Sequence, residues 1–168
     1  MFLVTQGGFT LAALLGGCVK VDSVDISQEA MDLCRKNVVL NGLENREGNY
    51  FVEDAFRFLK ERELSYDFII LDPPAFAKKK EDVVAACRGY KEIHRSLFKK
   101  APARSYALSC SCSYHVDEKL FQMVIFQAAH EAKRGVKIVG KHRLGLDHPI
   151  NLFHPESDYL KSFLLYLD

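Results

Sequence analysis

An uninterrupted apolar run, Phe68 to Leu71, stops at Asp72-Pro73-Pro74. A run without polar alternation is typical of a strand that is covered on both faces, as in the parallel sheets of α/β proteins. The two prolines lack backbone N–H groups and fix φ, so a strand must end there. The segment therefore predicts a buried strand whose end holds the Asp72 carboxylate on a stiff loop. Taken alone, an ordinary proline-stopped strand with a solvated aspartate explains it equally well.

Strand-like and helix-like segments alternate along the rest of the chain. We expect strands at residues 2–4, 19–24, 49–52, 66–71, 104–109, 136–141 and 158–167, and helices at 10–15, 27–41, 55–63, 81–100 (with a break near Gly89) and 117–132. Alternating β and α units favour an α/β fold with a mostly parallel, doubly wound, seven-stranded sheet. No helix separates the last two strands, which predicts a C-terminal antiparallel hairpin. At 168 residues, the chain has the length of one domain.

Glycines and acidic residues follow the first four predicted strands: Gly7-Gly8, Asp25, Asp54 and Asp72. The carboxyl ends of parallel strands meet at one edge of a sheet, where α/β proteins bind their ligands. Glycines let a ligand approach the backbone, and an acid after the second strand suits a ribose diol. Asp54 could accept a hydrogen bond from an adenine amino group. The pattern predicts a nucleoside cofactor, and the missing G-x-G-x-x-G disfavours NAD. In the alternative interpretation, Asp25 and Asp54 only cap helices.

A cysteine-containing loop follows the fifth predicted strand and reads Ser109-Cys110-Ser111-Cys112-Ser113. We expect the strand to have ended by Ser111, which leaves Cys112 in the loop. A zinc site that uses these cysteines is disfavoured, because C-x-C without a second close pair is a poor zinc signature. Buried structural thiols are the other interpretation, and we expect it to hold for Cys18 and Cys34.

The composition limits the class of protein and the cellular compartment that this chain fits. The net charge is +1 and the cysteine count is five, an odd number. No global basic field therefore attracts RNA, and a disulfide framework is not expected, which fits a reducing cytoplasm. No apolar stretch reaches the length of a membrane span. Local contacts to RNA phosphates could come from Lys78-Lys79-Lys80, although a solvated lysine run explains that segment equally well. A homodimer is compatible with the sequence.

Together, these motifs resemble the class I methyltransferases that use S-adenosyl-L-methionine (SAM) to make 5-methylcytosine in 23S ribosomal RNA. The matching segments are Gly7-Gly8-Phe9, Ser23-Val24-Asp25-Ile26-Ser27-Gln28-Glu29-Ala30, Asp72-Pro73-Pro74-Ala75-Phe76, Cys87-Arg88-Gly89-Tyr90-Lys91, Ser111-Cys112-Ser113, Asp147-His148-Pro149 and Tyr159-Leu160-Lys161. The resemblance implies a Rossmann-like class I methyltransferase fold, SAM as the cofactor and large-subunit rRNA as the partner.

The resemblance also implies roles for individual residues. Cys112 would be the nucleophile, and Asp72 would lie between the methionine moiety and the base. The implied SAM-binding residues are Gly7, Gly8, Phe9, Asp25, Ile26, Ser27, Asp54, Ala55, Asp72 and Pro73, with Ile26 and Phe56 flanking the adenine. The implied substrate-binding residues are Pro74, Phe76, Lys78, Arg88 and Lys91. No metal ion is expected.

Family members carry an N-terminal PUA-type RNA-binding module, so we expect residues 1–168 to be the catalytic domain without it. The tyrosine-bearing motif of the family's first strand reads Val4-Thr5-Gln6 here. Two alternatives stay open. One is a SAM-dependent enzyme that methylates another rRNA base, and the other is a non-catalytic SAM- or RNA-binding remnant. Only a reaction at C5 of a pyrimidine needs Cys112, because C5 becomes nucleophilic when a thiolate adds to C6.

Overall fold

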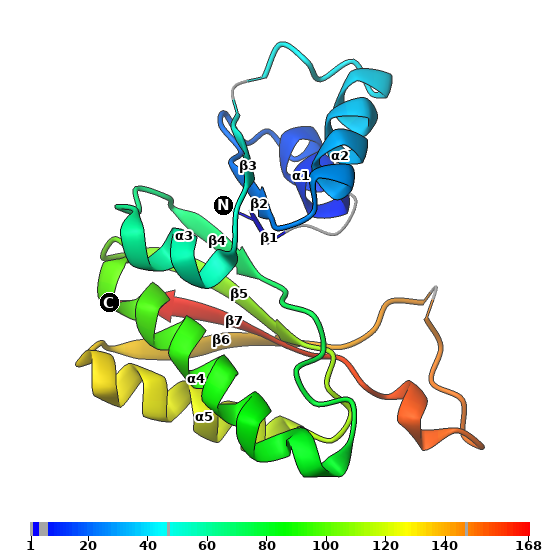
Figure 1. Ribbon diagram of the computed structural model, residues 1–168, viewed down its shortest axis with the longest axis vertical. Helices are drawn as coiled ribbons and strands as arrows, with labels where there is room; N and C mark the ends of the chain where they lie inside the picture. Colours follow the sequence, from blue (N-terminus) through cyan, green and yellow to red (C-terminus); the bar gives the residue numbers. More distant parts are fainter. Residues whose placement is uncertain (1, 4–6, 47, 147) are drawn as a thin grey trace. The chain divides into compact units, whose positions relative to one another are not determined.

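The computed structural model describes residues 2–3, 7–46, 48–146 and 148–168 (Figure 1). Val4, the altered Val4-Thr5-Gln6 motif and Asp147 lie outside the described residues. The chain divides into two compact units, Met1–Arg62 and Glu63–Asp168.

The first unit alternates short strands with helices. Its elements are β1 (Phe2–Leu3), α1 (Gly8–Leu15), β2 (Ser23–Asp25), α2 (Gln28–Leu40), β3 (Tyr50–Val52) and α3 (Ala55–Glu61). The strands β1 and β3 both pair with β2 in parallel, so β2 lies between them. The strand β2 is shorter than the predicted 19–24, and its last residue is Asp25.

Local signals explain the helix α2. The Ser27 side chain caps its first turn by accepting a hydrogen bond from the Ala30 N–H (3.2 Å). Met31, Cys34 and Val38 recur on one face and are buried. The predicted helix therefore forms with its boundaries nearly as expected.

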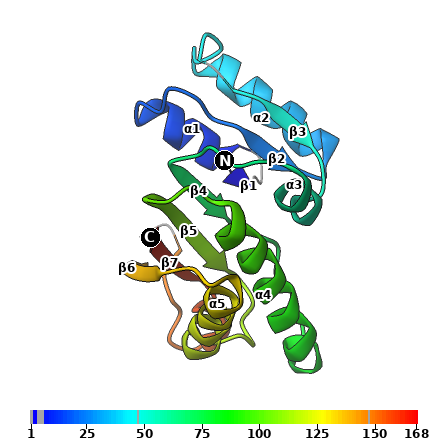
Figure 2. The same ribbon diagram turned by 90° about the vertical axis from the view of Figure 1, so that its left-hand side faces the viewer.

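The second unit contains four strands among its described residues. Its elements are β4 (Phe68–Leu71), η1 (Lys80–Asp82), α4 (Val83–Lys100), β5 (Ser105–Ser111), α5 (Glu118–Ala132), β6 (Val136–His142), η2 (Pro155–Ser157) and β7 (Lys161–Leu167). The strand order is β4-β5-β7-β6, with β4 and β5 parallel and β7 antiparallel to both neighbours. The predicted C-terminal antiparallel hairpin is therefore confirmed. Figure 2 shows α4 and α5 side by side, in agreement with their many contacts.

Several details of the second unit differ from the prediction: β4 begins at Phe68 instead of residue 66, α4 at Val83 instead of 81, and β7 at Lys161 instead of 158. The predicted break in α4 is wrong, because the helix continues through Gly89. An added Cβ there would lie 3.2 Å from Cδ2 of Phe76, so Gly89 provides room for the loop after β4. The strand β5 continues two residues beyond the predicted Ser109, because β7 pairs with it up to Ser111 opposite Lys161.

Within the described part of the chain, no helix is long and apolar enough to cross a membrane.

Candidate active site

The Gly7-Gly8 turn precedes α1 in the first unit. Gly7 has φ +85°, a left-handed conformation that favours glycine. A Cβ on Gly7 would lie 2.7 Å from Sγ and 3.0 Å from Cα of Cys34, so α2 also excludes a side chain there. Gly8 differs, since a Cβ on this exposed residue would meet nothing within 4 Å. Gly7 is therefore required by the fold, whereas Gly8 leaves its backbone open to a ligand.

Two carboxylates lie at the ends of the neighbouring strands β2 and β3. Asp25 Oδ1 accepts the Ser27 N–H at 2.8 Å, and Asp54 Oδ1 accepts the Arg57 N–H at 3.0 Å. The Glu53 N–H donates to the Asp25 carbonyl (3.0 Å), which joins the two strand ends. In each aspartate, one carboxylate oxygen accepts a hydrogen bond from a nearby backbone N–H. Among the described residues, the second oxygen of each carboxylate has no hydrogen-bond partner. Helix capping and ligand binding are therefore compatible at both aspartates.

Apolar side chains accompany these carboxylates. Ile26 directly follows Asp25 and has 74% of its surface exposed, an unusual fraction for isoleucine. Phe9 in α1 is half-buried, and so are Ala55 and Phe56 at the start of α3. Exposed apolar surface beside free carboxylate oxygens and an open glycine backbone fits the adenosine half of SAM.

In the second unit, the Asp-Pro-Pro loop and the cysteine loop follow neighbouring parallel strands. Leu71 at the end of β4 is opposite Ser109 in β5. Cys112 is the first residue after β5, and its Sγ lies 3.8 Å from the Pro73 carbonyl oxygen. The half-buried Asp72 carboxylate has no hydrogen-bond or ion-pair partner in the described part of the chain. The structure therefore brings a thiol beside the acid-bearing loop, as the sequence predicts.

Hydrogen bonds hold the residues on both sides of Cys112. Ser113 Oγ accepts the Ala77 N–H at 3.1 Å and shares a 2.9 Å hydrogen bond with the Tyr90 hydroxyl. Ser111 Oγ donates to the same hydroxyl at 3.0 Å. Tyr90 is fully buried, so this network lies in the protein interior. The two serines thus orient the loop and leave Cys112 between them.

Lys161 is a buried lysine behind the cysteine loop, with 8% of its surface exposed. Its Nζ donates to the carbonyl oxygens of Ser113 (2.6 Å) and Tyr159 (2.7 Å). The sequence alone assigns no role to this residue. One sequence signal points to Lys161: it stands at the start of the last apolar run. A lysine that is buried in such a run needs polar partners.

The electrostatics distinguish the two cysteines. Burial raises the pKa of the Cys112 thiol, the Asp72 charge raises it further, and the positive charge of Lys161 opposes both. Burial raises the pKa of Cys110 to about 11, and its Sγ contacts Ser162 Oγ at 3.5 Å. Cys112 is half-buried, whereas Cys110 is buried at 4% exposure. Cys112 is therefore the more accessible thiol.

Burial also raises the pKa of the Asp72 carboxyl. The group therefore keeps its proton to a higher pH than an exposed aspartate. A carboxyl that is protonated more readily can donate to a base that gains negative charge.

The predicted substrate-binding residues occupy different surroundings. Pro74, Lys78 and Arg88 are exposed. Phe76 is half-buried, with its ring centroid 4.7 Å from that of Tyr90. Lys91 forms a 2.9 Å ion pair with Glu131 of α5. The roles of these five predicted residues stay predictions.

The expected burial of two other cysteines, Cys18 and Cys34, is met at only one of them. Cys34 is buried as expected, but Cys18 is exposed, so the expectation for Cys18 is wrong. Cys18 lies in the turn after α1, where its N–H donates to the Ala13 carbonyl and residues 15–20 are all exposed. No group of three or more histidine, cysteine or acidic side chains among the described residues could hold a metal ion.

Comparisons with known proteins find relatives of this chain. A family model for S-adenosylmethionine-dependent methyltransferases matches residues 1–147. Ribosomal RNA large subunit methyltransferase I from Klebsiella pneumoniae (strain 342) is 40% identical over 160 residues, which cover 94% of this chain and 40% of that protein. The protein of the same name from Escherichia coli O139:H28 shows the same identity and coverage. The chain thus spans about 40% of the length of these curated relatives.

Solved structures agree on the fold. The crystal structure of SMU.776 complexed with SAH aligns with a TM-score of 0.80 at 24% identity, covering 98% of this chain and 44% of that one. The likeness confirms the class I methyltransferase fold. Since the family model also covers most of the sequence, the chain belongs to the SAM-dependent methyltransferases, whose cofactor is SAM.

Proposed function

We propose that this chain carries the catalytic machinery of a SAM-dependent methyltransferase that makes 5-methylcytosine in 23S rRNA through a covalent cysteine adduct. The observation that carries the proposal is the Cys112 thiol, which lies 3.8 Å from the Pro73 carbonyl in the Asp72-Pro73-Pro74 loop. The relatives named ribosomal RNA large subunit methyltransferase I support an rRNA substrate.

The proposed cofactor-binding residues are those that the sequence predicts. Gly7, Gly8, Phe9, Asp25, Ile26, Ser27, Asp54 and Ala55 would hold the nucleoside, and Asp72 and Pro73 would contact the methionine moiety. When it is bound, SAM supplies an electrophilic methyl group.

The protein's part in the chemistry centres on Cys112. Its thiolate adds to C6 of the cytosine, forming an S–C6 bond and making C5 nucleophilic. Asp72, whose carboxyl pKa is raised by burial, would contact N3 and stabilise the charge that builds on the ring. After C5 accepts the methyl group, a base removes the C5 proton. The electrons of the C5–H bond restore the C5–C6 double bond, the S–C6 bond breaks, and the thiolate is regenerated.

The test compares the two neighbouring cysteines. Cys112→Ala should abolish methyl transfer to a cytosine-containing 23S rRNA fragment and keep SAM binding, measured by calorimetry. Cys110→Ala is the matched control and should keep most of the activity, because Cys110 is buried. RNA with 5-fluorocytidine at the target should trap the wild type covalently, since the C5 fluorine cannot leave as a proton does.

Each alternative has its own outcome. Methyl transfer that survives in Cys112→Ala would contradict the C5 reaction and indicate another base. SAM binding without transfer to any rRNA fragment would indicate a non-catalytic remnant. Loss of transfer in Cys110→Ala alone would show that the wrong cysteine has been assigned. A homodimer and a cytoplasmic location stay predictions.

A further inference from the structure

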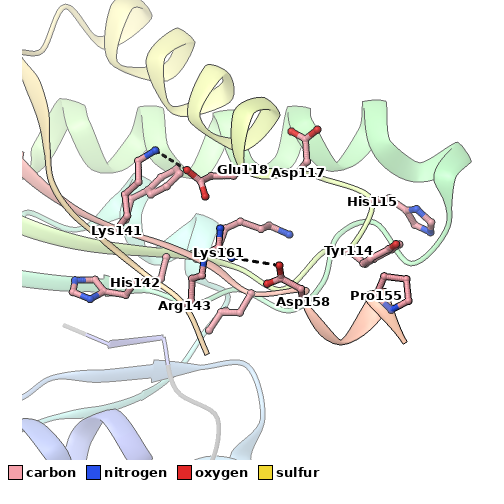
Figure 3. A pocket seen from close by; sticks show the side chains of 13 residues that line it. Tyr114, His115, Asp117, Glu118, Lys141, His142, Arg143, Pro155, Asp158 and Lys161 are labelled. Atoms are coloured by element: carbon pink, nitrogen blue, oxygen red, sulfur yellow. Dashed lines mark hydrogen bonds and ion pairs between the residues drawn. The ribbon is translucent and has the colours of Figure 1, made fainter. Parts of the chain in front are cut away.

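A pocket of about 710 Å³ opens in the second unit beside the cysteine loop (Figure 3). The loop after β5, the end of β6 and the start of β7 contribute its lining. Figure 3 shows Tyr114, His115 and Pro155 on one side and Lys141, His142 and Arg143 on the other, with Lys161 between them. The volume is in the range of small-molecule sites.

A short stretch of backbone links the pocket lining to the proposed nucleophile. Tyr114 lies two residues after Cys112, a separation that the backbone spans in at most roughly 7 Å. Lys161 lines the pocket and also donates to the carbonyl of Ser113, between these two residues. An RNA whose target base reaches Cys112 would therefore place a neighbouring nucleotide along this pocket.

Tyr114 supplies an exposed aromatic ring at the pocket wall. It has 45% of its surface exposed, and its ring centroid lies 5.3 Å from that of His115 in an edge-on arrangement. Tyr90 shows the contrast, since it is fully buried and its hydroxyl is held by two serines. An accessible ring beside a concave site is what stacking on a nucleic-acid base requires.

The charges of the pocket favour a single nucleotide over a long run of phosphates. The described lysine, arginine and acidic side chains that line it balance in number: Lys141, Arg143 and Lys161 against Asp117, Glu118 and Asp158. Lys141 pairs with Glu118 at 2.6 Å and Arg143 with Asp158 at 3.6 Å. Exposed pairs of this kind contribute little stability, so their members can exchange partners at low cost. The carboxylates can accept from base amino groups while the cations contact one phosphate.

We propose that this pocket binds the nucleotide adjacent to the target cytosine, with its base stacked on Tyr114. The inference rests on the proposed function, because it takes Cys112 as the residue that the target base reaches. It adds a second base-contacting site, which selects the sequence around the cytosine as well as the cytosine itself.

The test uses a single-stranded RNA that carries 2-aminopurine on either the 5′ or the 3′ side of the target cytosine. With the wild-type chain, we expect fluorescence quenching at one of the two positions. Tyr114→Ala should remove the quenching and raise the Kd about 5- to 150-fold, the range for loss of one stacked base. Tyr114→Phe keeps the ring and should stay within about twofold of the wild type.

Tyr106 in β5 offers a matched control. It is 41% exposed, and its ring centroid lies 5.3 Å from that of Tyr166, but it is near the opposite end of β5. Tyr106→Ala should leave quenching and Kd unchanged. Unfolding midpoints and SAM affinity should match among all these variants, which checks that the fold is intact.

A second measurement separates this inference from the proposed reaction. An abasic neighbour should lower kcat/KM of the wild type but not of Tyr114→Ala. Equal behaviour of the two proteins on both RNAs, or no quenching by the wild type at either position, would overturn the pocket assignment. Tyr114-dependent quenching without methyl transfer would instead leave the pocket standing and remove the proposed reaction.

Discussion

Replacing Lys161 with methionine should destabilise the protein and raise the pKa of the Cys112 thiol. The lysine side chain is 8% exposed, and its ammonium donates to the carbonyls of Ser113 and Tyr159 at 2.6 and 2.7 Å. Its positive charge also opposes the burial and the Asp72 charge that raise the Cys112 pKa. Methionine fills a similar volume but removes both hydrogen bonds and the charge.

The expected loss of stability follows from these contacts. A hydrogen bond to a charged group contributes about 1.5–3 kcal/mol, so two such bonds give an upper bound of roughly 3–6 kcal/mol. Burial of the lysine ammonium itself carries a desolvation cost that methionine avoids. We therefore expect the free energy of unfolding to fall by about 2–4 kcal/mol. Lys161→Arg keeps the charge and is the matched comparison.

Two assays measure the effect. Denaturant unfolding gives the free energy, and alkylation followed by mass spectrometry gives the rate at Cys112 as a function of pH. Only the thiolate reacts, so a higher pKa moves the rate profile to higher pH and lowers the rate below that pKa. Cys110 is an internal control, because its pKa of about 11 should keep it slow in every variant.

An unchanged unfolding free energy together with an unchanged Cys112 profile in Lys161→Met would contradict the role assigned to the lysine. A profile that moved to lower pH would show that the sign of the interaction is wrong. An equal pKa change in Lys161→Arg would show that the shape of the lysine, not its charge, sets the reactivity of Cys112.

Gly7→Ala should lower the free energy of unfolding by about 2–4 kcal/mol, from the strain of a left-handed alanine and the clash with Cys34. In the same denaturant assay, Gly8→Ala should change it by less than about 1 kcal/mol, and equal effects at both glycines would contradict this account. Asp25→Ala should weaken SAM binding by about 1.5–3 kcal/mol in calorimetry, and an unchanged affinity would remove the ribose assignment. RNA binding by these 168 residues, with their net charge of +1, should be weak and should decrease with salt; tight binding of an rRNA hairpin at high salt would contradict it.

Local sequence signals determined the order and type of the elements. Ser27, Asp54 and Asp117 cap helices as their side chains predict, and Asp72-Pro73-Pro74 ends a strand because the prolines cannot continue it. These effects act over a few residues, so they can be recognised without knowledge of the fold. The same holds for the alternation of strands and helices and for the position of Cys112 after β5.

Contacts between distant segments determine how the two cysteines of this loop differ. Cys110 and Cys112 have serines on both sides, but pairing with β7 buries Cys110 against Ser162 and leaves Cys112 more accessible. Lys161 is 48 residues from Ser113 in the sequence, yet it bonds to the carbonyl of that residue. Burial and hydrogen bonds between distant segments depend on strand pairing, which no local pattern specifies. The sequence therefore predicts that the reactive groups lie at strand ends. The pairing of β7 with β5 determines which thiol is accessible and which charge acts on it.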